Sequence, residues 1–208
     1  MAPGGSRGGG IAARSSSRRL TASCGSTAAR QSSAGAPISP ACRATRCTSR
    51  SPTTPFRSLV RALQCAGALE RVLELTVTHV SERVQFGRPL AKFQAIQQEL
   101  AKLAGEVAAA SAAADLAAET FLADPADAGL AIAVARVRIG EAVGRANGIA
   151  HQLHGAIGFT AEHRLHLFTT SLWAWRDEFG GAAHWAMSLG NRALAAGKDG
   201  FWPMVTAA

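Results

Sequence analysis

The chain has 208 residues, 48% of them hydrophobic, and a formal net charge of +8. This length is sufficient for one domain with a buried core, and no apolar run reaches the roughly 18 residues that a membrane span requires. The excess positive charge lies in residues 1–57, which contain nine arginines and no acidic residue, whereas the other 151 residues carry 13 basic and 14 acidic side chains. The high pI therefore does not predict nucleic-acid binding by the folded part.

Residues 1–57 are rich in serine, arginine, glycine and alanine, with Phe56 as their single aromatic residue. Such a segment cannot bury enough apolar surface to offset the entropy of ordering, so we expect a disordered tail. Three interpretations stay open. The tail could be a transit peptide, which would place an otherwise cytoplasmic protein in the mitochondrial matrix, or a basic arm without the aromatic residues that nucleic-acid binding favours. It could also be translated from the wrong start or frame of a G+C-rich gene.

From Ser58 to about residue 200, apolar residues recur with helical spacing. The pattern predicts helices over 59–84, from Phe93 onward, and over 126–154, 162–175 and 184–196, with a short tail over 201–208. In the second helix the apolar residues alternate at steps of three and four, as in a packing seam; they are Phe93, Ile96, Leu100, Leu103, Val107, Ala110 and Ala114. Asp124 and Pro125 should start the third helix and Gly155 should end it. Because no strand pattern is visible, we expect an all-α fold, an antiparallel bundle of the four-helix type.

The stretch ERVQFGRPLAKFQAIQQ, residues 82–98, lies between the first two predicted helices. A plain helical hairpin needs only small and polar residues at its turn, whereas Arg83, Gln85 and Phe86 suit a phosphate and a flat ring. Simpler interpretations remain open. Arg83 could complement the helix dipole, Gln85 could be an exposed turn residue, and Phe86 could fill a gap in the core.

A second stretch, HQLHGAIGFTAEHRLH, covers residues 151–166. Here a long helix stops at Gly155, and Gly158 follows in the loop. Glycines at such a place let the backbone approach a ligand closely. Gln152 is on the last turn of the helix and faces this loop.

Together the two stretches resemble the signatures of the acyl-CoA dehydrogenase family, in its C-terminal helical domain. The first is similar to R-x-Q-F-G followed by a proline and F-Q, the second to Q-x-x-G-G-x-G-F, and the resemblance extends over residues 58–195. It implies an FAD-dependent α,β-dehydrogenation of an acyl-CoA thioester. It also implies that FAD is held across a subunit interface, so that the chain forms a dimer or tetramer.

The resemblance implies a role in FAD binding for each matched residue. Arg83 would pair with the pyrophosphate, Gln85 would hydrogen-bond the same region, and Phe86 would pack near the adenosine end. Gln152 and the backbone at Gly155 and Ala156 would contact the adenine and ribose. Ala156 replaces the family's second glycine, and its N–H can still make the contact unless this position needs a positive φ.

The catalytic base is the larger departure from the family pattern. Many members carry a glutamate directly before a glycine, and an ungapped count places that position on Phe179, one residue after Glu178. We expect Glu178 to be the base if the loop is shifted by one residue; otherwise it is a surface acid beside Arg176. Other members carry the base in the first helix of this domain, where Glu70 and Glu74 are weaker candidates; both lie in the helix predicted over 59–84.

We expect no metal site. The four cysteines form no C-x-x-C pair. His151 and His154 are spaced i,i+3, as are His163 and His166, but the Glu-x-x-His pattern of di-iron bundles does not occur. His154 and His163 should therefore line the loop near FAD or pack at an interface.

Only one of the family's three parts is visible in the sequence, because the N-terminal helical domain and the middle β-domain have no counterpart before Ser58. We therefore expect a fragment that binds FAD poorly and does not turn over alone. The alternative is a non-catalytic helical scaffold or partner subunit of a flavoprotein complex.

Overall fold

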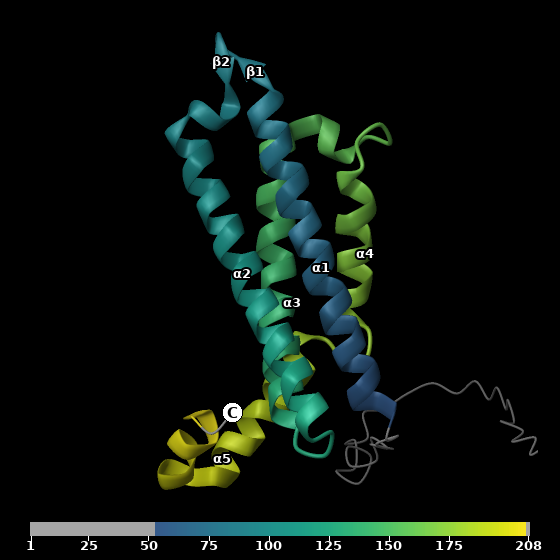
Figure 1. Cartoon of the computed structure of the whole chain (residues 1–208), viewed down its shortest axis with the longest axis vertical. Coiled ribbons are helices and arrows are strands. Elements are labelled where there is room, and N and C mark those ends of the chain that lie inside the picture. The colour runs from purple at the N-terminus through teal and green to yellow at the C-terminus, as the bar shows by residue number, and fades with distance from the viewer. Residues whose placement is uncertain (1–52, 207–208) are drawn as a thin grey trace, which may run out of the picture. The chain divides into compact units, whose positions relative to one another are not determined.

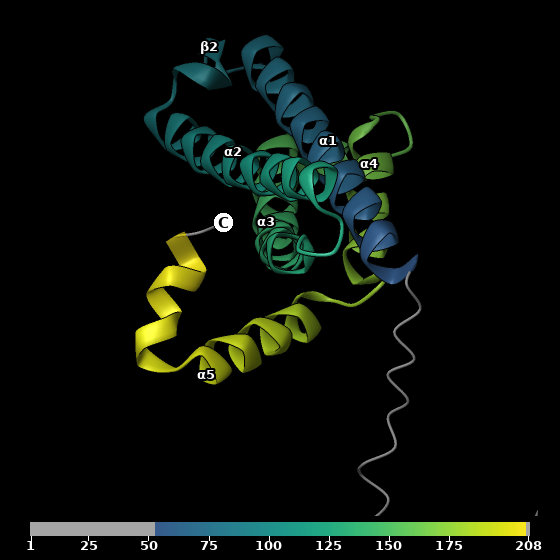
Figure 2. The same cartoon turned by 60° about the horizontal axis from the view of Figure 1, so that its bottom comes forward.

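The computed structural model describes residues 53–206. Its five α-helices are α1 Thr53–Glu82, α2 Gln94–Ala123, α3 Gly129–His154, α4 Leu165–Asp177 and α5 Ala182–Thr206. Helices α1 to α4 run alternately up and down beside one another, and α5 follows at the end where α4 finishes (Figures 1 and 2). This confirms the antiparallel bundle of the four-helix type.

The first helix begins earlier than the sequence analysis expected. Residues 53–57 were assigned to the tail, yet they form the first turns of α1. Phe56 explains the extension, because its ring lies 5.8 Å from that of Phe121 on α2, measured between centroids. Pro55 is compatible with a first helical turn, where no N–H is needed. The rest of the expected tail, residues 1–52, lies outside the described residues.

The last helix is longer than predicted. Residues 201–206 were expected to be a tail but are helical, and Gly197, with φ of 66°, divides α5 into two segments. The first segment ends where the sequence pattern ends, at Ala196. The second carries Pro203 and exposes the large apolar side chains of Phe201 and Trp202.

Helix α3 is the centre of the bundle, since it contacts α1, α2, α4 and α5. Its buried positions are mostly small, including Ala131, Ala135 and Ala142, and this allows the neighbouring helices to approach closely. Larger side chains fill the spaces between helices, among them Leu69 of α1, Leu103 of α2 and Leu172 of α4, all fully buried.

The predicted seam of α2 is buried only over its second half. Leu103, Val107, Ala110 and Ala114 are buried, whereas the earlier apolar residues are only partly covered. The reason is that α2 leans away from α1 and α3 towards its N-terminal end (Figure 1).

Two connections differ from the sequence prediction. The α1–α2 link contains a two-stranded ladder, β1 Val84–Gln85 and β2 Arg88–Pro89, followed by the 3₁₀ turn η2 Leu90–Lys92. Two residues per strand are too few to show an alternating pattern. The predicted start of α3 is wrong by three residues, because the Asp124 carboxylate accepts the Ala126 N–H within a turn that precedes Gly129.

None of the helices formed by residues 53–206 is both long and apolar enough to cross a membrane.

Candidate functional site

The β1–β2 hairpin presents its aromatic residue to solvent in a strained conformation. Phe86 and Gly87 have φ of 53° and 76°, so they form the two-residue turn that normally selects Asn-Gly. The Phe86 side chain is 91% exposed, which rules out a role in filling the core. A bulky residue with positive φ is unfavourable, and the Phe86 ring contacts the chain through Phe93, edge to face with centroids 6.2 Å apart. Backbone strain at an exposed aromatic residue is typical of contact sites.

Arg83 directly follows α1 and begins this hairpin. Its backbone N–H donates to the His79 carbonyl at 2.9 Å, and its own carbonyl accepts the Leu90 N–H at 2.9 Å. The side chain is exposed, and no carboxylate within residues 53–206 pairs with its guanidinium. Gln85 is also exposed, opposite Arg88 in the ladder. The hairpin therefore offers an unpaired cation, an amide and a ring.

The second motif lies at the end of α3. Gly155 has φ of 64° and ψ of −145° and leads into the 3₁₀ segment η3 Gly155–Phe159. Gln152, Gly155 and Ala156 are all exposed. Ala156 does not belong to the residues with positive φ, so the substitution of the family's second glycine introduces no backbone strain.

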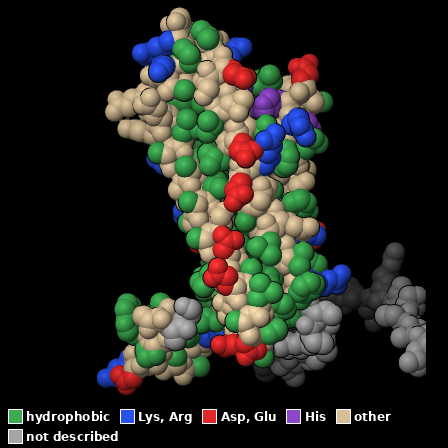
Figure 3. Space-filling view, viewed as in Figure 1, with side chains coloured by type: hydrophobic (Ala, Val, Ile, Leu, Met, Phe, Trp, Pro, Cys, Tyr) green, Lys and Arg blue, Asp and Glu red, His purple; other side chains and the backbone are tan. Residues whose placement is uncertain are grey.

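Both motifs lie at the same end of the bundle (Figure 1). His79, one turn before Arg83, stacks on His154, one residue before Gly155, with ring centroids 4.4 Å apart. The positive charge of Arg83 is close enough to contribute to a lowered pKa of His79, after the larger effect of burial. In Figure 3 histidine side chains appear at this end, near basic side chains.

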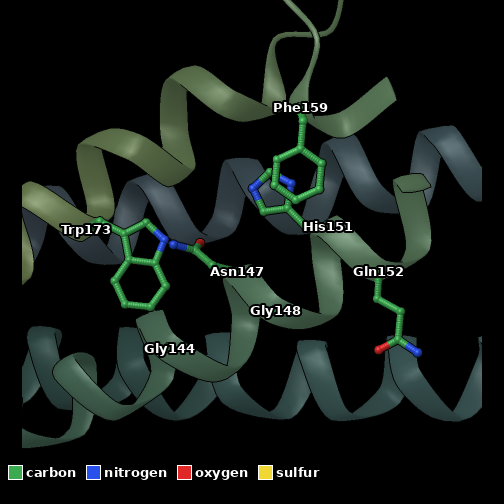
Figure 4. Close-up of a pocket in the computed structure, with 7 residues that line it drawn as sticks. All are labelled: Gly144, Asn147, Gly148, His151, Gln152, Phe159 and Trp173. Atoms are coloured by element: carbon green, nitrogen blue, oxygen red, sulfur yellow. The ribbon is translucent and has the colours of Figure 1, made fainter. Parts of the chain in front are cut away.

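A shallow pocket of about 500 Å³ opens beside the second motif. Figure 4 shows its lining residues: Gly144, Asn147, Gly148, His151, Gln152, Phe159 and Trp173. The Phe159 ring stacks on His151 with centroids 4.1 Å apart. The buried Oδ1 of Asn147 and Nδ1 of His151 have no hydrogen-bond partner. Gln152 also borders an adjacent hollow lined by Lys102 and Arg145.

Three histidines from separate segments meet next to the motifs. His79 of α1, His154 of α3 and His163 of the η3–α4 loop each bring one ring nitrogen within 4.8 Å of the others. The i,i+3 partners noted in the sequence do not join them: His151 binds the Thr169 hydroxyl, and His166 bonds to the His163 carbonyl. The sequence did not identify His79 as a member of this cluster, because nothing in the sequence around His79 indicates that the end of α3 packs against it.

The predicted base, Glu178, lies at the other end of the bundle, in the α4–α5 connection (Figure 1). Its carboxylate Oε2 forms an ion pair with Arg61 of α1. The weaker candidates lie on the exposed surface of α1, where Glu70 accepts a hydrogen bond from Ser111 and Glu74 pairs with Arg71. The structure thus places Glu178 at the opposite end of the bundle from Arg83 and Gln152.

A buried arginine that the sequence analysis did not single out holds the Glu178 loop. Arg136 of α3 is 3% exposed, and its Nη2 lies 2.9, 2.6 and 3.0 Å from the carbonyl oxygens of Arg176, Glu178 and Gly180. Burial lowers the pKa of its guanidinium, although arginine remains charged at neutral pH. A charged residue inside the apolar run AIAVARVRIG is the signal that could have identified it.

Comparisons with known proteins agree with this architecture. The model of the acyl-CoA dehydrogenase C-terminal domain matches residues 56–177. The acyl-CoA dehydrogenase IpdE2 of Mycobacterium tuberculosis is 40% identical over 111 residues, which cover 53% of this chain and 33% of the relative.

Solved structures show the same fold. The crystal structure of the ChsE4–ChsE5 complex from Mycobacterium tuberculosis has a TM-score of 0.64 at 30% identity, covering 68% of this chain and 38% of that one. Butyryl-CoA dehydrogenase from Megasphaera elsdenii has a TM-score of 0.64 at 25% identity, covering 68% of this chain and 37% of that one. The chain thus spans little more than a third of the length of these relatives. With more than half of its residues matched by the family model, the chain belongs to the acyl-CoA dehydrogenase family and carries that family's C-terminal helical domain.

Proposed function

We propose that this chain provides the FAD-contacting helical domain of an acyl-CoA dehydrogenase, which removes the α-proton and β-hydride of an acyl-CoA thioester. FAD supplies the hydride acceptor when it is bound. Relatives named as acyl-CoA dehydrogenases support the reaction class. They come from bacteria, so we propose a cytoplasmic location.

The observation that carries the proposal is the exposed hairpin. Arg83 is without an anionic partner in the described part of the chain, and a planar guanidinium can bind phosphate oxygens in a bidentate manner. Phe86 points into solvent, although the exposure of its apolar ring and the positive φ of its backbone are both unfavourable. A cofactor with a pyrophosphate and flat rings fits this pair. Gln85, Gln152 and the backbone N–H groups at Gly155 and Ala156 would make the polar contacts.

The separation of the candidate sites favours an oligomer. Arg61, the partner of Glu178, lies 22 residues before Arg83 on α1, which corresponds to about 33 Å along the helix. This is longer than the distance from the pyrophosphate to the reactive ring of FAD, so one FAD cannot contact Arg83 and Glu178 of the same chain. We therefore propose that each FAD lies between two copies.

Glu178 remains our proposed general base. Arg61 holds Oε2, and Oε1 makes no hydrogen bond among residues 53–206, so proton removal is assigned to Oε1. The same ion pair is the observation that favours the second candidate function, a non-catalytic partner subunit. In that case Glu178 only joins α1 to the α4–α5 connection.

An FAD-binding experiment tests the proposal. The full chain is fused behind the N-terminal and middle domains of the acyl-CoA dehydrogenase IpdE2 of Mycobacterium tuberculosis. The affinity of the fusion protein for FAD is then measured by flavin fluorescence. Arg83→Lys should weaken FAD binding about tenfold or more, because a charge-assisted bidentate contact contributes about 1.5–3 kcal/mol. Its melting temperature should hardly change, since an exposed helix-end cation contributes only about 0.3–1 kcal/mol.

Arg71→Lys is the matched control, because Arg71 is exposed on the same helix and pairs with Glu74, its neighbour one turn along. It should leave FAD affinity unchanged. Light scattering of the fusion should show a dimer or larger assembly. Equal FAD affinities for wild type and Arg83→Lys would refute the phosphate clamp, and a monomer that still binds FAD tightly would refute the shared site.

A further inference from the structure

The three-histidine cluster, His79, His154 and His163, has the composition of a metal site. Its rings belong to three segments that are distant in the sequence, and each offers a nitrogen within 4.8 Å of the other two. His154 and His163 meet edge to face at 4.6 Å between centroids, and His79 stacks on His154. No acidic side chain belongs to the cluster.

The hydrogen bonding of His154 fixes which of its nitrogens is available. Its Nδ1 lies 2.7 Å from the Ala150 carbonyl oxygen. A carbonyl only accepts, so Nδ1 carries the proton and Nε2 carries a lone pair. Nε2 is buried and has no partner, and the whole residue is 5% exposed. A backbone carbonyl bonded to the far nitrogen is the usual arrangement around a histidine ligand.

Burial disfavours the charged form of two of the rings, His154 and His79. Burial lowers the pKa of His154 to about 4, and His79 and His163 add smaller effects in the same direction. Burial and the nearby His163 also lower the pKa of His79. The buried Nε2 of His154 is therefore unprotonated at neutral pH, which is the form that binds a metal.

We propose that His79, His154 and His163 form a binding site for a divalent transition metal ion of the zinc class, with water as the fourth ligand. Three imidazole nitrogens and a water suit tetrahedral zinc, whereas magnesium and calcium require oxygen ligands. This proposal is independent of FAD binding.

Metal binding requires a modest closure of the cluster. Zinc–nitrogen bonds of about 2.0–2.1 Å place the ligand nitrogens about 3.4 Å apart in a tetrahedral site. His79 and His163 are only half-buried and can rotate towards His154. His163 must also give up the 3.2 Å bond that its Nδ1 accepts from the Leu165 N–H. That N–H is at the start of α4, where helix donors have no partner within the helix and water can replace the lost bond.

The site would connect the two flavin motifs. His79 lies one turn before Arg83, and His154 and His163 lie on either side of the Gly155–Phe159 segment. A metal ion would therefore fix the hairpin end of α1 to the loop that follows α3, where only ring packing joins the three histidines in the structure.

Titration of the tag-free, EDTA-treated 208-residue chain tests the site. Isothermal titration with zinc chloride should give one ion per chain, and cobalt(II) should produce the visible absorption of a tetrahedral site. His79→Asn and His163→Asn alter half-buried rings and should fold normally by circular dichroism. Each should weaken zinc binding at least about tenfold, since even changes outside the ligand shell cost 10–100-fold.

His166→Asn is the matched control, because His166 lies three residues after His163, in the first turn of α4, but does not belong to the cluster. It should bind zinc and cobalt as the wild type does. The proposal is overturned if the wild type binds no zinc at micromolar concentrations, or if His166→Asn weakens binding as much as His163→Asn does. It is also overturned if bound cobalt shows only the weak spectrum of an octahedral aqua ion.

Discussion

Replacing Arg136 by methionine should destabilise the bundle and release the Glu178 loop. The Nη2 of Arg136 lies within hydrogen-bond distance of three backbone carbonyls: that of Arg176 in the last turn of α4, and those of Glu178 and Gly180 directly after the helix. These carbonyls lie at the negative end of the helix dipole and have no partners within the helix. Methionine has a similar length and remains compatible with an apolar site, but it cannot donate.

The size of the effect follows from the hydrogen bonds that Arg136 Nη2 makes to these carbonyls. A hydrogen bond from a charged donor contributes about 1.5–3 kcal/mol when its partner is fully buried. The residues that accept these bonds are half-buried, so water can reach part of the loop and about 1 kcal/mol per carbonyl is the appropriate estimate. Nη2 carries two hydrogens, so at most two full hydrogen bonds are lost, and the Gly180 carbonyl keeps its bond from Trp185 Nε1. We expect Arg136→Met to reduce the free energy of unfolding by about 2 kcal/mol.

Urea unfolding followed by circular dichroism measures this loss. Arg138→Met is the control, because Arg138 lies two residues along α3 and pairs with the partly buried Glu106 and the exposed Glu141. Glu106 keeps Arg145 as a second partner, so this substitution should cost below about 1 kcal/mol. Trypsin should also cut after Arg176 faster in Arg136→Met than in the control. Equal losses of stability in the two variants, with unchanged cleavage, would show that Arg136 does not hold the loop.

Two further predictions concern the backbone and the buried thiol. Gly155→Ala should reduce the free energy of unfolding in urea by about 1–3 kcal/mol, because a φ of 64° with a ψ of −145° is strained for alanine, although a Cβ would meet no atom within 4 Å. As a control, Gly67→Ala, in open space on α1, should increase the free energy of unfolding by about 0.5–1 kcal/mol. An unchanged stability of Gly155→Ala would show that the backbone at this position is not strained for alanine. Burial raises the pKa of the Cys65 thiol from 9.0 to about 11, so alkylation of Cys65 at pH 8, followed by peptide mass spectrometry, should be at least about 100-fold slower in the native chain than in urea. The thiol of the unfolded chain ionises at lower pH than that of the native chain, so the stability that the neutral, buried thiol contributes is present below pH 9 and is lost as the pH rises towards 11. Rapid alkylation of the native chain would show that Cys65 is accessible.

Local sequence signals predicted the elements whose causes are local. The end of α3 at Gly155 was predicted correctly because only a residue tolerant of positive φ suits that cap. The apolar positions predicted to form the seam of α2 lie on its buried face in the second half of the helix, where Leu103 and Val107 are buried. The start of α1 was missed because Phe56 depends on a ring contact with Phe121, 65 residues away. Tertiary contacts of this kind leave no periodic signal in the sequence.

The candidate site was predictable only in part for the same reason. Arg83 and Gln152 could be identified from their motifs, but the sequence does not show that Glu178 lies a bundle length away from them. The histidines illustrate the limit most clearly. The i,i+3 spacing suggested the pairs His151/His154 and His163/His166, whereas the fold unites His154 and His163 with His79. The cluster depends on how α1 packs against α3, which spacing within one helix cannot reveal.

Backbone strain marks both ends of the bundle at the residues next to the predicted functional groups. Within residues 53–206, the non-glycine residues with positive φ are Phe86 and Phe179, and each is followed by a glycine that also has positive φ. Phe86 lies beside Gln85, and Phe179 lies beside Glu178. Strain of this kind costs about 1–3 kcal/mol per residue and persists only where other contacts enforce it. The hairpin ladder does so for Phe86, and Arg136 does so for Phe179 by holding the carbonyls of Glu178 and Gly180. The two rings also make contacts of their own: Phe86 meets Phe93 edge to face with centroids 6.2 Å apart, and the Arg57 guanidinium lies 5.1 Å from the Phe179 ring centroid. The strained residues are therefore held in place by contacts on both sides of each turn, next to the groups that each loop presents.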